Sequence, residues 1–246
     1  MGLSHLISIV GAGPGDPELL TMKAMKRLGS ADLVLYDALL GAAILDCAKP
    51  GTELVYVGKL YKDGQDQTAR QNEIHQQFLK AARQGKRVVR LKAGDPFIFG
   101  RGSEEARFCK EAGLCYEVVP GVTAALAGAA RFEVPVTERG KNALALFYTG
   151  HRVNGSFSDI EAVVAVLQTG SPVMVYMGLN NLVKLAETLV TRGISVQTPV
   201  QLMSRIGQID ECFFSTNLGE TAAFLQENSP PMPTVIVIGK HTNPVA

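Results

Sequence analysis

The sequence predicts an α/β protein of two α/β domains, the first with a mainly parallel sheet and the second with a mixed sheet. Short apolar runs alternate with longer segments of helical spacing along the whole chain. The runs of the first half are almost continuously hydrophobic, as expected for strands buried on both faces. In the second half, neighbouring strands near residues 200 and 212 have no helix between them, which indicates a mixed sheet.

In the first half, the elements follow the βαβ rhythm of a parallel sheet covered by helices on both faces. The predicted strands are residues 6–10, 33–36, 54–57, 88–91 and 116–119. The predicted helices are residues 18–28, 39–47, 71–83 and 104–111. Because parallel strands end at one common edge, residues that follow these strands are expected to lie near one another.

The character of the sequence changes after Pro120 and Gly121, so we expect one domain over residues 1–121 and a second over 122–246. A small-residue helix, 123–130, leads into an irregular segment, 133–142. The predicted strands are residues 143–148, 173–176, 198–202, 211–214 and 234–238. Helices predicted at 159–167, 181–191 and 218–227 separate some of them.

The composition is that of an ordinary globular protein, with 246 residues, 46% hydrophobic residues and a formal net charge of +1. So small a charge supplies no general field for nucleic acid or an anionic membrane, and we expect neither as a partner. No apolar run is long enough to span a bilayer, and the first residues lack the features of a signal peptide. The four cysteines form no C-x-x-C pair. We therefore expect a cytoplasmic protein without a metal site.

The segment 88–105 carries the clearest indication of a ligand site. It reads as a buried strand, a tight turn and a glycine-rich loop that opens a helix. Gly94 would let a ligand approach the backbone, and residues 97–99 add an apolar wall. Arg101 and Glu104 then place a positive and a negative charge at the end of this loop. This combination suits a small ligand with one flat face and one charged group.

A second glycine-rich loop, residues 11–17, follows the first strand and resembles the phosphate loop of a dinucleotide-binding fold. The spacing argues against that reading, because the motif requires glycine where this chain has Asp16. A carboxylate there would repel a pyrophosphate, and Pro14 removes a backbone donor. An NAD-dependent oxidoreductase therefore stays a weak alternative, and a nucleoside without phosphates fits better.

Eight motifs occur in one order along the chain: residues 11–17, 36–37, 57–59, 88–105, 119–124, 135–137, 149–151 and 175–179. Together they resemble the motifs of the uroporphyrinogen-III C-methyltransferases, tetrapyrrole methylases that use S-adenosyl-L-methionine (SAM). The resemblance extends from about residue 7 to 240, and the run 94–102 separates this family from relatives that act later in cobalamin synthesis. Siroheme synthases carry additional domains, which we do not expect in a chain of this length.

The resemblance implies that SAM lies in a cleft between two α/β domains, in a protein that forms a homodimer. The residues that match the SAM-binding positions of the family are Pro14, Ala93, Gly94, Asp95, Ile98, Thr123, Ala124 and Met177. Asp95 can accept hydrogen bonds from hydroxyl or amino groups of the cofactor. Ile98 and Met177 can pack on its adenine, although apolar residues of this type are also common in a core. Thr123 can also cap the helix that follows it.

The resemblance also assigns residues to the tetrapyrrole substrate, a ring that carries many carboxylates. Arg101, Glu104 and Arg139 match positions that face this substrate, and an arginine fork can hold a carboxylate bidentately. Asp37 and Lys59 match the proton acceptor and proton donor of the family, and each closes a predicted strand. Methylation of a pyrrole carbon needs displacement at the sulfonium methyl and loss of a proton, but no metal.

The implied activity is SAM-dependent methylation of uroporphyrinogen III at C2 and C7, giving precorrin-2 through precorrin-1, with S-adenosyl-L-homocysteine as the second product. The product would enter a siroheme or cobalamin-type pathway. This chain departs from the family at Ala93 and Ser103, where most members have glycine, and at residues 60–67, a segment about three residues longer than usual. Two alternatives therefore stay open: a related methylase acting on a different tetrapyrrole, and a non-catalytic module that binds SAM or a tetrapyrrole.

Overall fold

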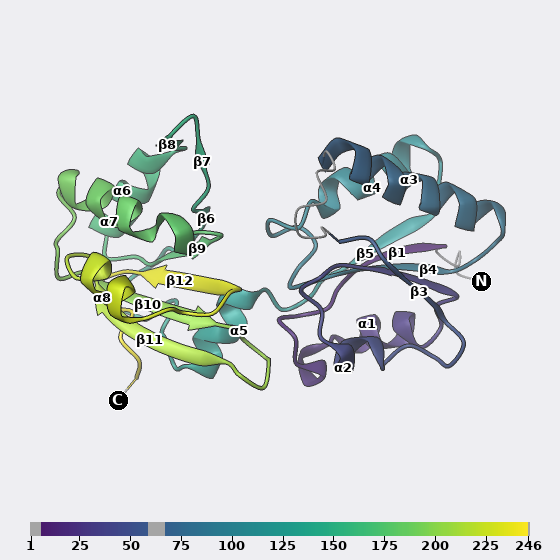
Figure 1. Ribbon diagram of the computed structural model, residues 1–246, viewed down its shortest axis with the longest axis horizontal. Coiled ribbons are helices and arrows are strands. Elements are labelled where there is room, and N and C mark those ends of the chain that lie inside the picture. Colours follow the sequence, from purple (N-terminus) through teal and green to yellow (C-terminus); the bar gives the residue numbers. More distant parts are fainter. Residues whose placement is uncertain (1–5, 59–66, 246) are drawn as a thin grey trace. The chain divides into compact units, whose positions relative to one another are not determined.

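The computed structural model describes residues 6–58 and 67–245 and divides into two compact units, residues 1–123 and 124–246 (Figure 1). Each unit is built around a five-stranded sheet with helices on its faces. The predicted α/β class, with a parallel first sheet and a mixed second sheet, is confirmed. The two units are described one after the other.

In the first unit, all strand pairs are parallel and the strand order is β3-β2-β4-β1-β5. The strands are β1 (Ile7–Gly11), β2 (Leu33–Tyr36), β3 (Glu53–Tyr56), β4 (Val88–Lys92) and β5 (Tyr116–Val119). Strands β4 and β1 occupy the middle of the sheet and are buried at every residue. The carboxyl ends of the five strands therefore form one edge, which is where ligands bind in open α/β sheets.

Helices cover both faces of this sheet (Figure 1). They are η1 (Pro17–Leu19), α1 (Met22–Leu28), α2 (Ala42–Leu45), α3 (Gln67–Arg83) and α4 (Gly102–Glu111). On one face, Phe78 of α3 and Ala106 of α4 pack with Ile9 and Leu35. On the other face, Leu28 of α1 and Ile44 of α2 pack with different strand residues. Two apolar layers thus hold the sheet between them.

Two predicted helices of this unit are shorter than expected, for local reasons. The segment 18–28 divides because Thr21 takes an extended conformation and its hydroxyl caps α1, accepting a hydrogen bond from the Ala24 amide at 3.1 Å. The segment 39–47 is helical only over α2, because Gly41 before it is extended. Capping residues thus override the apolar spacing at these ends.

The second unit has the strand order β11-β10-β12-β9-β6, in which only the β6–β9 pair is parallel. The strands are β6 (Leu146–Thr149), β9 (Val173–Tyr176), β10 (Pro199–Ser204), β11 (Cys212–Asn217) and β12 (Thr234–Ile238). As predicted, β10 and β11 pair antiparallel with no helix between them. A short hairpin of β7 (Arg152–Val153) and β8 (Ser156–Phe157) was not predicted, because two residues per strand are too few to show a period.

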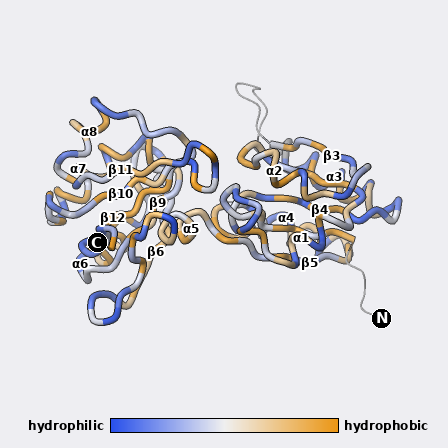
Figure 2. The backbone as a smooth tube through the Cα atoms, turned by 90° about the horizontal axis from the view of Figure 1, so that it is seen from below, coloured by the Kyte–Doolittle hydropathy of each residue, from blue (hydrophilic) through white to orange (hydrophobic). Residues whose placement is uncertain are grey.

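Helices also cover both faces of the second sheet. They are α5 (Ala124–Arg131), α6 (Ile160–Gln168), η2 (Leu179–Asn181), α7 (Leu182–Thr191) and α8 (Thr221–Glu227). Residues of α6, α7 and α8 pack on one face, whereas α5 lies on the other, where Gly128 approaches Met203 and Ile206. Figure 2 shows hydrophobic colour along the strands β9 and β12 of this sheet. None of the helices in the described ranges is long and apolar enough to cross a membrane.

A buried carboxylate fastens α1 to the sheet of the first unit. Glu117 of β5 accepts hydrogen bonds from Arg27 of α1 and, at 3.0 Å, from the Ser8 hydroxyl, and Lys23 lies 2.7 Å from it. Burial opposes the charge on Glu117, but the hydrogen bonds from Arg27, Lys23 and Ser8 outweigh it and lower its pKa to about 2. The ionised carboxylate therefore belongs to the folded state.

This network predicts acid sensitivity that depends on Glu117. Its folded pKa of about 2 lies below the ordinary value of 4.5, so its stabilisation is present above pH 4.5 and is lost toward pH 2. The free energy of unfolding of the wild type should fall across that window by on the order of 3 kcal/mol more than that of Glu117→Gln. Urea denaturation between pH 6 and pH 2 measures this difference, and parallel pH curves for the two proteins would contradict it.

Candidate active site

The loops that follow β1 and β4 are joined at the carboxyl edge of the first sheet. The Ala12 amide donates a hydrogen bond to the Lys92 carbonyl at 2.8 Å. Gly13 and Gly94 then exchange two backbone hydrogen bonds of 3.2 and 2.7 Å. The loop that contains Pro14 is thereby fixed beside residues 93–95, two segments that are 80 residues apart in sequence.

Three glycines allow a third loop, the one after β5, to join this contact. A Cβ atom on Gly121 would lie 2.3 Å from the Gly94 carbonyl oxygen, and one on Gly11 would lie 2.6 Å from the same atom. Gly94 itself has a φ of +67°, which favours glycine. The sequence suggested that Gly94 makes room for a ligand, but the structure shows that it also makes room for neighbouring backbone.

Asp95 holds the joined loops in register. One carboxylate oxygen accepts a hydrogen bond from the Phe97 amide at 2.9 Å, and the other accepts one from the Gly121 amide at 3.1 Å. The first closes its own turn, and the second ties that turn to the segment after β5. Each oxygen retains a lone pair, so Asp95 can still accept a hydrogen bond from a ligand.

The structure brings together the predicted cofactor residues of the first unit. Pro14, Ala93 and Asp95 are half-buried at the joined loops, and Ile98 lies in the same turn, where its amide donates to the Asp95 carbonyl at 3.3 Å. Thr123, which is buried, comes two residues after Gly121. Half-buried apolar side chains beside a carboxylate and close-packed backbone fit a nucleoside with amino and hydroxyl groups.

The other two predicted cofactor residues, Ala124 and Met177, belong to the second unit. Ala124 begins α5, and the next amide, of Ala125, donates to the Tyr176 hydroxyl at 3.0 Å. Met177 follows β9 with a φ of +53°, an uncommon conformation for a residue with a side chain, and it is exposed. Its sulfur lies 3.1 Å from Nε2 of His151. Met177 therefore stands at the carboxyl end of its strand and is not a core residue.

Asp37, the predicted proton acceptor, follows β2 at the same edge of the first sheet. Nη2 of Arg90 donates to both of its carboxylate oxygens, at 2.8 and 2.9 Å. Arg90 lies in the middle of β4, and its side chain is only 3% exposed, whereas that of Asp37 is 29% exposed. In this ion pair, Arg90 is buried inside the first unit, whereas Asp37 reaches the carboxyl edge of the sheet. Lys59, the predicted proton donor, lies outside the described residues.

Two further charged residues complete a buried cluster with Asp37 and Arg90. Glu105 of α4 is fully buried and accepts from Arg90 at 3.0 Å and from Lys92 at 3.1 Å. The Lys92 amine also lies 4.0 Å from Asp37. Burial is the main cause that lowers the pKa of Lys92, and the positive charge of Arg90 adds to it. The four formal charges of this cluster sum to zero.

Sequence reasoning did not assign roles to Arg90, Lys92 or Glu105. A signal was present, because Arg90 and Lys92 alternate with apolar residues in a strand that is otherwise hydrophobic. In a strand this alternation places both on one face of the sheet. Their partners could not be read from the chain, since Glu105 and Asp37 come from other elements.

Of the residues predicted to face the substrate, Arg101 and Glu104 are paired with each other. The Arg101 guanidinium donates to both Glu104 oxygens, at 2.9 and 2.7 Å, across the start of α4. This pairing lowers the pKa of Glu104. Arg139 is exposed in the second unit and has no ion-pair partner in the described part of the chain. The sequence suggested three separate substrate contacts, whereas within residues 6–58 and 67–245 Arg101 and Glu104 form a pair and Arg139 has no ion-pair partner.

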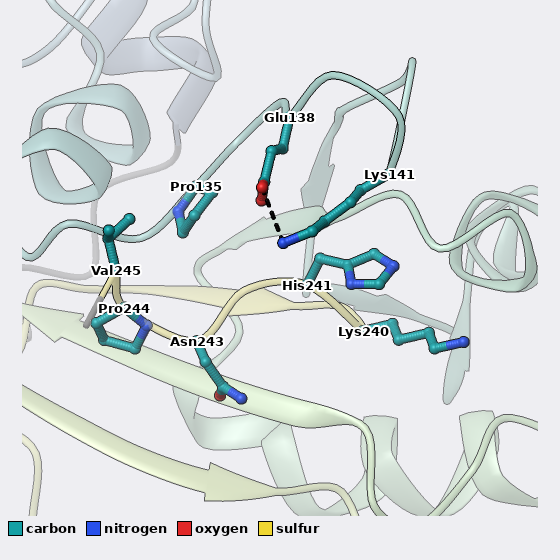
Figure 3. A pocket seen from close by; sticks show the side chains of 8 residues that line it. All are labelled: Pro135, Glu138, Lys141, Lys240, His241, Asn243, Pro244 and Val245. Carbon is teal, nitrogen blue, oxygen red and sulfur yellow. Dashed lines mark ion pairs between the residues drawn. The ribbon is translucent and has the colours of Figure 1, made fainter.

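The second unit contains a cavity of about 360 Å³ (Figure 3). Its lining includes Glu138 and Lys141, which form an ion pair of 2.8 Å, and His241. None of the predicted site residues lines it. Within the described ranges, no group of three histidine, cysteine or acidic residues is placed to hold a metal ion.

The parallel sheet, its joined loops and the charged cluster have the arrangement of an α/β enzyme that binds ligands at the carboxyl edge of a sheet. Residues 6–222 match the profile of the family described as Tetrapyrrole (Corrin/Porphyrin) Methylases. The chain belongs to this family, and the predicted resemblance is confirmed.

Three similar proteins agree with this assignment. A siroheme synthase of Pseudomonas fluorescens is 40% identical over 95% of this chain and 49% of its own length. The chloroplastic SAM-dependent uroporphyrinogen III methyltransferase of Arabidopsis thaliana is 38% identical over 95% of this chain and 63% of its own. The chain thus spans about half to two thirds of the length of these relatives. A uroporphyrin-III C-methyl transferase of Thermus thermophilus, solved with S-adenosylhomocysteine, has a TM-score of 0.80 and 37% identity, covering 95% of this chain and 97% of that one.

The close approach of Gly121 to Gly94 predicts that a Cβ atom added at Gly121 strongly lowers the stability of the fold. Gly121→Ala should lower the free energy of unfolding by about 3 kcal/mol, because the added Cβ meets backbone atoms that cannot rotate away. Gly41→Ala is the matched control, since nothing lies within 4 Å of a Cβ there and its φ is −70°. That control should cost at most about 1 kcal/mol. Urea denaturation measures both variants, and equal losses would contradict the close approach.

Proposed function

We propose that this chain methylates uroporphyrinogen III at C2 and C7 with SAM as methyl donor, giving precorrin-2 through precorrin-1 in siroheme or cobalamin-type biosynthesis. The names of the Arabidopsis and Thermus proteins support this substrate, and the bound S-adenosylhomocysteine supports the donor. The homodimer that the resemblance implies and the cytoplasmic location expected from the cysteines belong to the same proposal.

One observation carries the proposal: β4 serves both halves of the reaction. Its residue Arg90 holds the Asp37 carboxylate, and the chain that continues directly from the strand forms the loop of Ala93 and Asp95. The candidate proton acceptor and the candidate cofactor loop are therefore positioned by one buried strand. Rigid strands position reacting groups more accurately than mobile loops do.

In this proposal Pro14, Ala93, Gly94, Asp95, Ile98, Thr123, Ala124 and Met177 bind the cofactor. Asp95 accepts hydrogen bonds, while Ile98 and Met177 contact the adenine. When bound, SAM supplies an electrophilic methyl group. The residues around it orient the two reactants and exclude water, which can supply a large part of the rate acceleration.

The protein's own chemistry in this proposal is proton transfer and carboxylate binding. Asp37 accepts the proton lost from the methylated ring system, and its pairing with Arg90 orients the acceptor. Lys59 is the proton donor. Arg101 and Arg139 bind carboxylates of the substrate, with Arg101 exchanging Glu104 for a substrate carboxylate. A related methylase that acts on another tetrapyrrole would use the same groups. The two functions are therefore distinguished by which tetrapyrrole the protein methylates.

The first test is turnover. Purified protein, SAM and enzymatically generated uroporphyrinogen III, mixed without oxygen, should give the absorbance of precorrin-2 or its oxidised form. Asp37→Asn should lower kcat by about 100-fold or more, the typical contribution of a general base, with SAM affinity unchanged. Asp32→Asn is the control, because Asp32 precedes the same strand and pairs with Lys49 and Arg87. SAM binding without a methylated product would refute the proposed substrate.

The second test concerns the cofactor loop. Asp95→Ala should weaken SAM binding by about 100-fold, because it removes two hydrogen bonds to a charged group as well as the contact with the cofactor. Asp16→Ala is matched to it, since Asp16 also follows a strand and also accepts from the amide two residues ahead. Isothermal titration calorimetry measures both affinities, and equal values for the two variants would refute the assignment of this loop.

A further inference from the structure

We propose that Glu105 is a positioning residue, which holds the guanidinium of Arg90 in the one orientation that presents the Asp37 carboxylate at the edge of the sheet. This inference rests on the proposed function, since it assumes that Asp37 accepts a proton. Glu105 itself lies inside the unit and touches no reactant, because its side chain is fully buried.

In the described part of the chain, one carboxylate oxygen of Glu105 accepts all of the hydrogen bonds made to this side chain. Nε of Arg90 lies 3.0 Å from Oε1, Nζ of Lys92 lies 3.1 Å from it and Nε2 of Gln71 lies 3.4 Å from it. The other oxygen, Oε2, is buried without a hydrogen-bond partner in the described part of the chain. A buried carboxylate with one unsatisfied oxygen is costly. Its place in the cluster therefore calls for a role beyond filling space.

The orientation of Arg90 depends on groups around its whole guanidinium. Nη1 donates to the Leu91 carbonyl at 3.0 Å and to the Leu35 carbonyl at 3.3 Å, while Nη2 reaches Asp37. Nε donates to Glu105, which is its one hydrogen-bond acceptor among the residues that the structure describes. Because the guanidinium is planar and rigid, fixing Nε also fixes the direction of Nη2.

Charge balance gives Glu105 a second effect on Asp37. Two cations, Arg90 and Lys92, are shared between two carboxylates, and the Lys92 amine is already 4.0 Å from Asp37. Without the charge of Glu105, both cations would be drawn to Asp37 alone. The ammonium of Lys92 would then compete with the bidentate fork of Arg90, and the acceptor would move out of its orientation.

The test compares Glu105→Gln with Glu117→Gln in the full chain. Both residues are buried carboxylates held by ion pairs in the first unit, but Glu117 contacts α1 and not Asp37. A misplaced reacting group can cost about 100-fold in rate, so Glu105→Gln should lower kcat by about that factor. Its SAM affinity should stay within threefold of the wild type. Glu117→Gln should keep both values even if it unfolds more easily. A kcat for Glu105→Gln equal to that of Glu117→Gln would overturn the proposal.

A second variant keeps the proposal testable if Glu105→Gln does not fold. Lys92→Met with Glu105→Leu removes one charge of each sign, so the buried cluster stays neutral. This double variant should fold and bind SAM, yet kcat should still be lowered by about 100-fold, because Nε of Arg90 has lost its acceptor. Wild-type kcat in the double variant would show that Glu105 only balances charge, and would overturn the proposal.

A crystal structure separates this inference from the proposed function. If the wild-type protein does not methylate uroporphyrinogen III, the proposed function fails, but the geometry can still be measured. In either variant, the two contacts from Arg90 Nη2 to Asp37 should be broken or replaced by a contact from another group. Retention of both contacts at their present lengths would overturn the positioning role whatever the substrate is.

Discussion

The first unit depends on a guanidinium buried in the middle of a parallel sheet. Arg90 lies on the central strand between Val89 and Leu91, and a buried cation is tolerated only when its charge and donors are matched. The structure supplies two carboxylates and two backbone carbonyls for this purpose. One of the carboxylates, Asp37, reaches the edge of the sheet, so the need to neutralise Arg90 also orients a group at the candidate site.

The second constraint is the close approach of the loops after β1, β4 and β5. Three glycines allow backbone contact, and Asp95 adds a hydrogen bond that ties two of the loops together. The edge of the sheet is therefore organised before a ligand arrives, which lowers the entropy cost of binding.

These two constraints agree with the place of the chain among the tetrapyrrole methylases. A methyl transfer to a reactive ring needs little beyond orientation of the reactants and a group that takes up a proton. The first unit provides a rigid loop set and an oriented carboxylate, both extending from β4. In the second unit, Met177 is exposed and has an uncommon backbone conformation at the end of β9.

The sequence by itself determined the α/β class, the succession of helices and strands along the chain, and the motifs that define the family. These follow from local periodicity and from short runs of residues. It also indicated the candidate cofactor loop, since Gly94 and Asp95 are adjacent in the chain. The tertiary structure alone decided which charges meet. Arg90 pairs with Asp37, 53 residues away, and with Glu105 of a helix that packs on the sheet. Such pairs depend on how strands order in the sheet and how helices pack on it, and spacing along the chain carries no record of either.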